Sequence, residues 1–306
     1  MILPMIILPL SVWHLSDSRK KALTEIVLFS NHPALEVMPI EVEAEIRVFS
    51  QEEFHALDRQ IMGIIFAVHN DFGRFLDEAL FKRAILIRCI EQGIVPAETE
   101  ARIRVIHQTF CKDYFMDLLF GGGLMVEAKT SETLTPTHRA HALNYLLLTG
   151  MKHGRLVNLR PARVQHEFVS TNLDAVRRRK FLVVDSDWRE PNKESTWLKK
   201  QIIELLHDWG AFLEVTLYRD AVIHFLGGPD NAFVQVEFLD GYRTLGFQKI
   251  CLLKDDTAFV CTAITHSMDQ MREHQRRFLA HTRLRFLQWV NLNHARIEFT
   301  TIAKEQ

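Results

Sequence analysis

Apolar residues recur with two different periods in the first half of the chain, and the change of period predicts the first elements. Within 57–89 they recur every three or four positions, for example from Ile61 to Val68, which is the spacing of an amphipathic helix. A break at 71–73 divides this stretch. We therefore expect two helices, the second of which carries Glu78.

Two apolar strands joined by glycines follow the helices. Residues 114–120 and 124–129 are almost entirely apolar, and Gly121, Gly122 and Gly123 lie between them. Consecutive glycines supply the positive φ angles that a tight hairpin needs. The sequence therefore predicts a β-hairpin.

Three charged residues interrupt these apolar strands: Asp117 on the first arm, and Glu127 and Lys129 on the second. Burying a carboxylate is costly unless it is paired or holds a metal. Two acids beside a lysine suit an oxygen-liganded Mg²⁺ with a neighbouring cation that steadies a nucleophilic water or a phosphate. The alternative is a Glu–Lys pair on a solvated strand face.

A further helix is predicted after the hairpin. Thr135 and Pro136 are typical of a helix start, and His138, His141 and Tyr145 then fall at i, i+3 and i+7 on one face. The ordinary pKa of histidine, about 6.5, suits donation to a phosphate oxygen or a role as general base. The alternative for His141 is an ordinary histidine on the helix surface.

With these residues in place, the stretch from about 55 to 171 resembles the GxxExxY family, a branch of the PD-(D/E)XK nuclease superfamily. The matching pieces, in chain order, are Val68-His69, Phe72-Gly73, Leu76, Glu78, Asp117, Glu127 with Lys129, Leu134-Thr135-Pro136 with His138, Leu143-Asn144-Tyr145-Leu146, and Leu156-Val157-Asn158.

The resemblance implies a metal-dependent nuclease that hydrolyses phosphodiester bonds of nucleic acid. Asp117 and Glu127 would hold Mg²⁺ (or Mn²⁺), and Glu78 would complete or support the metal shell. Lys129 would position the attacking water or the scissile phosphate. The same resemblance places the helix face of His141 and Tyr145 near the metal, so both are candidate catalytic residues.

The chain also departs from the family pattern. Phe75 stands at the family's name-giving glycine, Phe81 at its tyrosine, His141 at a usual glutamine and Met116 at the proline of the superfamily's name. These departures keep a second function open. In it the protein is a non-catalytic nucleic-acid-binding or adaptor protein on a nuclease-like scaffold, and the retained acids are structural.

The second half looks like a degenerate copy of the first. The matching pieces are Asp71-Phe72-Gly73 with Asp208-Trp209-Gly210, Val157-Asn158-Leu159 with Val290-Asn291-Leu292, and Glu167-Phe168 with Glu298-Phe299. Repeats of this length indicate duplicated domains. Our alignment pairs the site residues Glu78, Asp117, Glu127 and Lys129 with Val215, Leu252, Thr262 and Ile264, so we predict a second domain without catalytic residues.

We therefore expect an α/β protein with tandem PD-(D/E)XK-like domains, each a mixed β-sheet flanked by helices. The predicted boundaries are 38–171 for the domain with the intact site, 172–195 for a linker, and 196–306 for the degenerate domain. The two domains should pack as a pseudo-dimer within one chain. Residues 1–37 begin with an apolar stretch that contains prolines and lacks the basic segment of a signal peptide. We expect them to be a disordered extension or a misplaced start.

Composition adds little to this picture. The chain has 306 residues, 47% hydrophobic and 25% charged, with a formal net charge of −1. Its four cysteines show no CxxC spacing, which favours a reducing, cytoplasmic location. No run of about 18 apolar residues occurs, so we expect no membrane span.

A basic helix is the candidate nucleic-acid contact in the second half. Arg272, Arg276 and Arg283 share one face of the helix expected over 269–289. This face is either a platform for nucleic acid, DNA or RNA, or the solvated side of an amphipathic helix.

Overall fold

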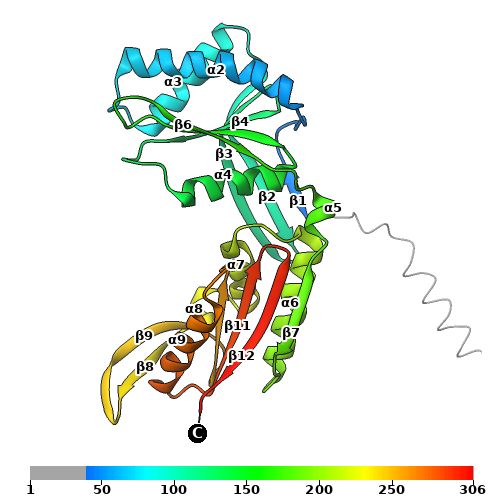
Figure 1. Ribbon diagram of the computed structural model, residues 1–306, viewed down its shortest axis with the longest axis vertical. Coiled ribbons are helices and arrows are strands. Elements are labelled where there is room, and N and C mark those ends of the chain that lie inside the picture. The colour runs from blue at the N-terminus through cyan, green and yellow to red at the C-terminus, as the bar shows by residue number, and fades with distance from the viewer. Residues whose placement is uncertain (1–38, 306) are drawn as a thin grey trace, which may run out of the picture. The chain divides into compact units, whose positions relative to one another are not determined.

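Two six-stranded mixed sheets, each flanked by helices, form the part of the protein that the structure describes, residues 39–305 (Figure 1). The structure is a computed structural model. The strand orders are β1-β2-β3-β4-β5-β6 and β7-β12-β11-β10-β9-β8. The expected fold class is thereby confirmed, whereas the expectation for residues 1–37 lies outside the described residues.

The first sheet and its helices contain the predicted helices, hairpin, helix and strand in that order, together with strands β1, β2 and β6, which the sequence analysis did not predict. The elements are β1 (Ile40–Val42), α2 (Gln51–Phe72), α3 (Glu78–Glu91), β2 (Ala97–His107), β3 (Phe110–Phe120), β4 (Leu124–Lys129), α4 (Pro136–Thr149), β5 (His153–Asn158) and β6 (Gln165–Ser170). α2 and α3 cover one face of this sheet and α4 covers the other (Figure 1).

Local sequence signals set the helix ends. Ser50 and Glu53 form a capping box at the start of α2, and Gly73, with a φ of 70°, ends that helix. Thr135 caps α4 and Pro136 is its first residue, as predicted. The break between α2 and α3 therefore lies where the sequence placed it.

The β3–β4 hairpin turns at the predicted glycines. Gly121 and Gly122 have φ angles of 59° and 71°, which side-chain-bearing residues rarely adopt. A Cβ at Gly122 would lie 2.4 Å from the carbonyl oxygen of Glu45, and one at Gly123 would lie 2.5 Å from the Phe49 ring. The turn needs glycine both for its backbone angles and because a neighbouring segment packs against it.

The second half contains the remaining elements. They are α5 (Ala175–Arg178), β7 (Leu182–Asp187), α6 (Lys193–Trp209), α7 (Val215–Phe225), α8 (Pro229–Ala232), β8 (Phe233–Asp240), β9 (Arg243–Lys254), β10 (Thr257–Thr262), α9 (Met268–Ala280), β11 (Phe286–Asn293) and β12 (Arg296–Ala303). β7 lies inside the expected linker 172–195 and pairs in parallel with β12. The domain boundaries themselves stay a prediction.

Strands β8 to β12 repeat the topology of β2 to β6. In both series the successive pairings are antiparallel, antiparallel, parallel and antiparallel. α4 connects the parallel pair β4–β5, and α9 connects the equivalent pair β10–β11. The two halves therefore have the same order of strands and crossover helices.

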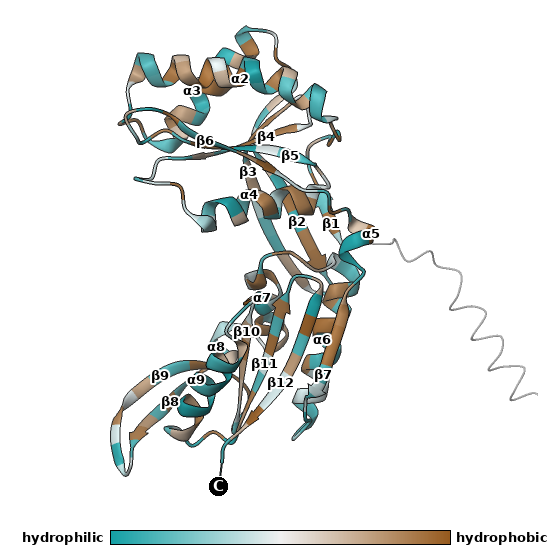
Figure 2. Cartoon of the chain, viewed as in Figure 1, coloured by the Kyte–Doolittle hydropathy of each residue, from teal (hydrophilic) through white to brown (hydrophobic). Residues whose placement is uncertain are grey.

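One hydrophobic core joins the halves. Helices α6 and α7 contact β2 and β3 of the first sheet as well as β9 and β10 of the second, and apolar positions follow α6 and β2 (Figure 2). The Trp209 indole N–H donates to the Ile106 carbonyl at 2.8 Å. The contact joins the sheet of one half to the helices of the other, which differs from the like-with-like interface of an isologous pair.

Candidate active site

Strand pairing brings together the three charged residues of the hairpin. Leu118 pairs with Val126 across β3 and β4, and continuing this register places Asp117 opposite Glu127. Lys129 lies two residues beyond Glu127 and therefore on the same face of β4. The hairpin thus accounts for the convergence of residues that are ten and twelve positions apart in the sequence.

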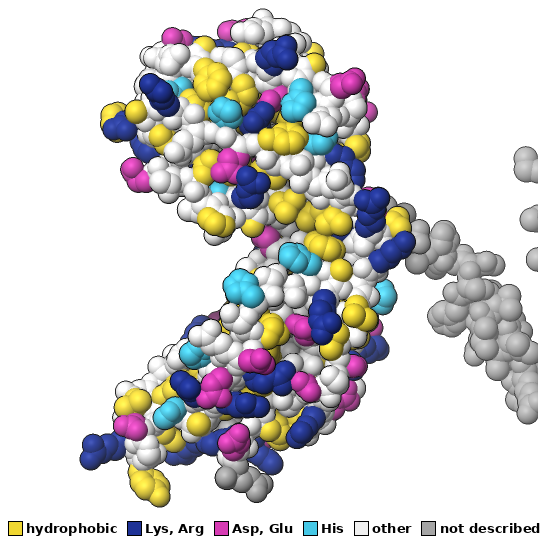
Figure 3. Space-filling view, in the orientation of Figure 1, with side chains coloured by type: hydrophobic (Ala, Val, Ile, Leu, Met, Phe, Trp, Pro, Cys, Tyr) yellow, Lys and Arg dark blue, Asp and Glu magenta, His cyan; other side chains and the backbone are white. Residues whose placement is uncertain are grey.

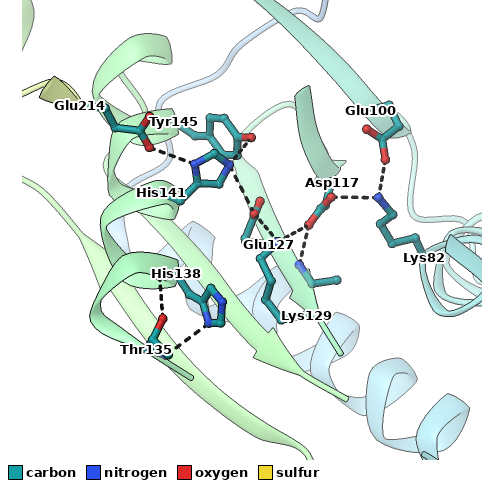
Figure 4. A network of polar contacts seen from close by, with 11 residues as sticks. Lys82, Glu100, Asp117, Glu127, Lys129, Thr135, His138, His141, Tyr145 and Glu214 are labelled. Carbon is teal, nitrogen blue, oxygen red and sulfur yellow. Dashed lines mark hydrogen bonds and ion pairs between the residues drawn. The ribbon is translucent and has the colours of Figure 1, made fainter. Parts of the chain in front are cut away.

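The two carboxylates converge on one ammonium group (Figure 4). Lys129 Nζ lies 2.7 Å from Glu127 Oε1 and 3.5 Å from Asp117 Oδ2. The Ala128 backbone N–H also donates to Asp117 Oδ2 at 2.9 Å. Asp117 and Glu127 are only 7% and 2% exposed, so this is a buried ion cluster and not the solvated Glu–Lys pair of the alternative interpretation.

The pKa values of both Glu127 and Lys129 are raised in this cluster. Burial, together with the neighbouring charge of Asp117, raises the pKa of Glu127 to about 7, although Lys129 acts in the opposite direction. Burial lowers the pKa of Lys129, but the charges of Glu127 and Asp117 outweigh it, so the net shift is upward. Lys129 therefore stays an ammonium at neutral pH, while Glu127 carries a destabilising charge.

The structure adds a lysine that the sequence analysis missed. Lys82 of α3 donates to Asp117 Oδ1 at 2.9 Å and also forms an ion pair with Glu100. Lys82 lies four residues after Glu78, on the same helix face, and this spacing was the available signal. The sequence analysis predicted no strand over β2, so it gave no reason to select Glu100.

Glu100 marks a change of face in the β2–β3 pair. Ala97 packs with the α2 and α3 side of the sheet, whereas Ala101 packs with the α4 side. Glu100, between them, has a φ of 53°. Because Thr99 and Ala101 pair with Leu118 and Met116, Glu100 lies opposite Asp117. Asp117 therefore lies opposite the residue at which β2 changes its buried face. At this position its carboxylate is within reach of α3 on one side and of Lys129 on the other.

His141 extends the cluster into the second half of the chain. Its Nε2 lies 2.7 Å from Tyr145 Oη and 3.8 Å from Glu127 Oε1. Its Nδ1 lies 2.9 Å from Glu214 Oε1, at the start of α7. The hydrogen bond to Glu214 raises the pKa of His141, against the effect of burial. Burial raises the pKa of Tyr145, so its hydroxyl stays protonated.

The other residues singled out in the sequence lie around this cluster. Glu78 is the first residue of α3, and its charge contributes to the raised pKa of Lys129. His138 caps α4 by accepting from the Thr135 N–H at 3.2 Å. Phe75 is 74% exposed, so nothing there requires a glycine, and Phe81 is a fully buried residue of α3.

The donor set fits a hard divalent cation held by Asp117 and Glu127. Glu127 Oε2 is buried and has no hydrogen-bond partner, which is a costly arrangement for a carboxylate oxygen. Within residues 39–305 no three His, Cys, Asp or Glu side chains form a ready metal cage. Mg²⁺ characteristically binds through one or two carboxylates and keeps several waters, so two carboxylates are sufficient.

The second half has apolar or uncharged residues at the corresponding strand positions. Thr262 pairs with Asn291, as Lys129 pairs with Asn158. Val260, two residues earlier, is therefore the counterpart of Glu127. Our sequence alignment, which placed Thr262 at Glu127, was shifted by two residues. Strand pairing, which the alignment could not use, corrects it.

The same correction applies on the neighbouring strand. Ala258 pairs with Leu252, and continuing that register places Ile250 opposite Val260. Ile250, not Leu252, is the counterpart of Asp117. The charges of the hairpin site have no equivalent at these positions.

The helix expected over 269–289 was wrong in length: α9 ends at Ala280 and β11 begins at Phe286, so Arg283 follows the helix and does not share its face. All three arginines are engaged in ion pairs. Arg272 contacts Asp187 at 2.9 Å, Arg276 contacts Glu273 at 3.9 Å, and Arg283 contacts Glu237 at 3.3 Å. Basic and acidic side chains are interleaved over this region (Figure 3). The surface around these arginines therefore carries acidic as well as basic side chains.

Across residues 39–305 no helix is both long and apolar enough to span a membrane.

Comparisons with known proteins agree with this geometry in the first half. No curated protein matches the chain. A solved structure described as "Crystal structure of SSO0001" is similar at 14% identity, over 54% of this chain and 82% of its own, with a TM-score of 0.24, too low to carry an argument. Residues 55–170, which contain the whole hairpin site, match the family model of the PD-(D/E)XK nuclease superfamily.

Proposed function

We propose that the protein is a metal-dependent nuclease whose active site is the Asp117–Glu127–Lys129 cluster. The observation that carries the proposal is the convergence of two buried carboxylates on one lysine, within the stretch that matches the nuclease superfamily. Glu127 Oε2 lacks a partner. A divalent cation would supply one.

Each residue of the cluster has a distinct role in this proposal. Asp117 and Glu127 would hold Mg²⁺ or Mn²⁺, which would lower the pKa of a bound water and neutralise charge on the phosphate. Lys129 donates to the attacking water or to a phosphate oxygen. His141, oriented by Glu214, donates to the phosphate, and Tyr145 fixes the imidazole ring. Glu78, at the start of α3, would support the metal shell.

Two arginines beside the site support a nucleic-acid substrate. Arg160 donates to the carbonyl of Thr130, directly after Lys129, and to the carbonyl of Arg74. Neither arginine forms an ion pair with an acid in the part of the chain that the structure describes, in contrast to the α9 arginines. Arg160 lies next to the proposed phosphodiester site, and Arg74 is joined to Arg160 through its backbone carbonyl, so both suit contacts with backbone phosphates. We therefore assign backbone contacts to Arg74 and Arg160 in preference to Arg272, Arg276 and Arg283.

We further propose that the first half is a GxxExxY-type domain and that the second half is its degenerate duplicate. The repeated topology and the uncharged residues at the site positions support this. In this view 38–171 and 196–306 form a fused pair in which only the first member is catalytic, and the protein acts in the cytoplasm.

The test is cleavage of labelled DNA and RNA in Mg²⁺ or Mn²⁺. Lys129→Ala should abolish cleavage while circular dichroism shows a folded protein. Lys112→Ala is the matched control, because Lys112 is a lysine of the same hairpin that pairs instead with Asp220. Cleavage that survives in Lys129→Ala would exclude this site.

A non-catalytic adaptor is the second candidate. The observation that favours it is that Lys82 and Lys129 already pair with the carboxylates, an arrangement that also suits a structural ion cluster. An adaptor would bind nucleic acid equally well in EDTA and in Mg²⁺, and it would cleave none of the substrates tested.

A further inference from the structure

A cavity of about 620 Å³ opens beside the site. Its walls come from α4, from the loop between α6 and α7, and from the turn between β11 and β12. Apolar side chains such as Leu147 and Leu292 line much of it. The cavity therefore needs the second half of the chain, whose own strands carry no counterpart of the metal site.

The cavity shares a wall with the nuclease site. His141 lines it and also reaches within 3.8 Å of Glu127 Oε1. Glu214, the hydrogen-bond partner of His141, lines it as well. His141 is thus shared by the Glu127–Lys129 pair and the cavity, so the cavity adjoins the place proposed for the phosphate.

An aromatic pair stands at the cavity. Phe212 and His294 stack with ring centroids 5.6 Å apart and an interplanar angle of 26°, and both residues line the cavity. Phe212 has a φ of 71°, an outlier for a bulky side chain. Such a conformation persists only when its surroundings hold it, and it often marks a functional site.

We propose that this cavity binds an unpaired nucleobase adjacent to the scissile phosphate. A base is a flat aromatic ring with a polar edge. Phe212 and His294 offer a stacking surface, and Glu214 and Asn144 offer polar partners for the edge. The inference rests on the proposed nuclease function and specifies its substrate. A base in a duplex must leave its stack to enter such a cavity, so the substrate is a single strand, a frayed end or a flipped nucleotide.

The test is binding of fluorescein-labelled single-stranded oligonucleotides, DNA and RNA of one sequence, measured by anisotropy in Ca²⁺ on an Asp117→Asn background. Phe212→Leu should weaken binding about 5- to 150-fold, given the usual contribution of one stacked base. Phe212→Tyr should restore it, since the ring is kept. Phe247→Leu is the control, because Phe247 is a 67% exposed aromatic of β9 that lies outside the cavity.

A second readout separates the cavity from general loss of structure. Replacing one nucleotide at a time by an abasic residue should weaken binding at a single position, and Phe212→Leu should erase that positional effect. Equal affinity of Phe212→Leu and the parent for both oligonucleotides would overturn the proposal. So would an abasic scan without a sensitive position.

The outcomes also distinguish this inference from the proposed function. Cleavage by the wild-type chain with no effect of Phe212→Leu on binding would refute the base cavity and leave the nuclease intact. Binding that depends on Phe212 without any cleavage would refute the nuclease and support the cavity. Absence of both would refute both.

Discussion

Asn158 and Asn291 make the same clamp in the two halves of the chain. Asn158 accepts from the backbone N–H of Ser131 at 3.1 Å and donates to the carbonyl of the same residue at 2.8 Å. Asn291 does both with Ile264, at 2.9 Å each. Each asparagine thus fixes the chain just after the strand that carries, in the first half, Glu127 and Lys129.

Each asparagine also makes an equivalent hydrogen bond with the strand that follows it in the chain. Asn158 also donates to Gln165, and Asn291 to Glu298, each seven residues onward. A buried amide satisfied by the same three partners in both halves is difficult to obtain by chance similarity of fold. It supports the proposed duplication independently of the strand order, and it fixes the register that the sequence alignment missed.

Because Glu127 Oε2 has no hydrogen-bond partner, we expect Glu127 to lower the stability of the metal-free protein and to be required for metal binding. Glu127→Gln should melt at a higher temperature than the wild-type chain in EDTA at about pH 8, since it removes a buried charge that burial and Asp117 disfavour. Mg²⁺ or Ca²⁺ should raise the melting temperature of the wild type but not that of the variant. Differential scanning fluorimetry measures both effects, and a metal response retained by Glu127→Gln would contradict them.

The arginines beside the site predict a local salt dependence. Arg160→Ala, or Arg74→Ala, should weaken binding of single-stranded nucleic acid and reduce the slope of log K against log salt by about one per contact. Arg276→Ala is the control, since this α9 arginine is already paired with Glu273. A larger effect from the α9 variant would move the binding surface to the second half.

Sequence reasoning recovered the parts of the structure that local rules determine. The two helices that flank Gly73, the glycine turn and the Thr135 cap follow from residues adjacent in the chain. Asp117 and Glu127 were found because charges in apolar strands stand out. Lys82, Glu100 and Glu214 were not recognised as members of the site, because their contacts depend on packing between elements far apart in sequence.

Glu214 predicts a contribution of the second half to catalysis. Glu214→Ala should lower the cleavage rate about 10- to 100-fold, a typical loss when the partner that orients an active-site histidine is removed. Asp220→Ala is the matched control, because Asp220 lies on the same helix and also reaches the first half, through Lys112. Equal rates for the two variants would remove Glu214 from the mechanism.

Because the pKa of His153 is lowered in the folded chain, we expect the protein to lose stability in mild acid. Burial, together with the charges of His55 and Lys152, holds the pKa of His153 below the ordinary histidine value of about 6.5. The unfolded chain therefore binds this proton first, and stability present above about pH 6.5 is lost as the pH falls toward the folded-state pKa. Urea titrations at about pH 8 and pH 5 should show a smaller loss for His153→Gln than for the wild type. His266→Gln, at an exposed position, should behave as the wild type.

The core shared through α6 and α7 has a consequence for how such a chain evolves. Trp209 and its neighbours close the apolar face of β2 and β3, so deleting the second half would expose that face to water and unfold the half that contains Asp117, Glu127 and Lys129. Melting should then be a single cooperative event across residues 39–305. A substitution in either half therefore changes the stability of both, so natural selection acts on the two halves as one folding unit.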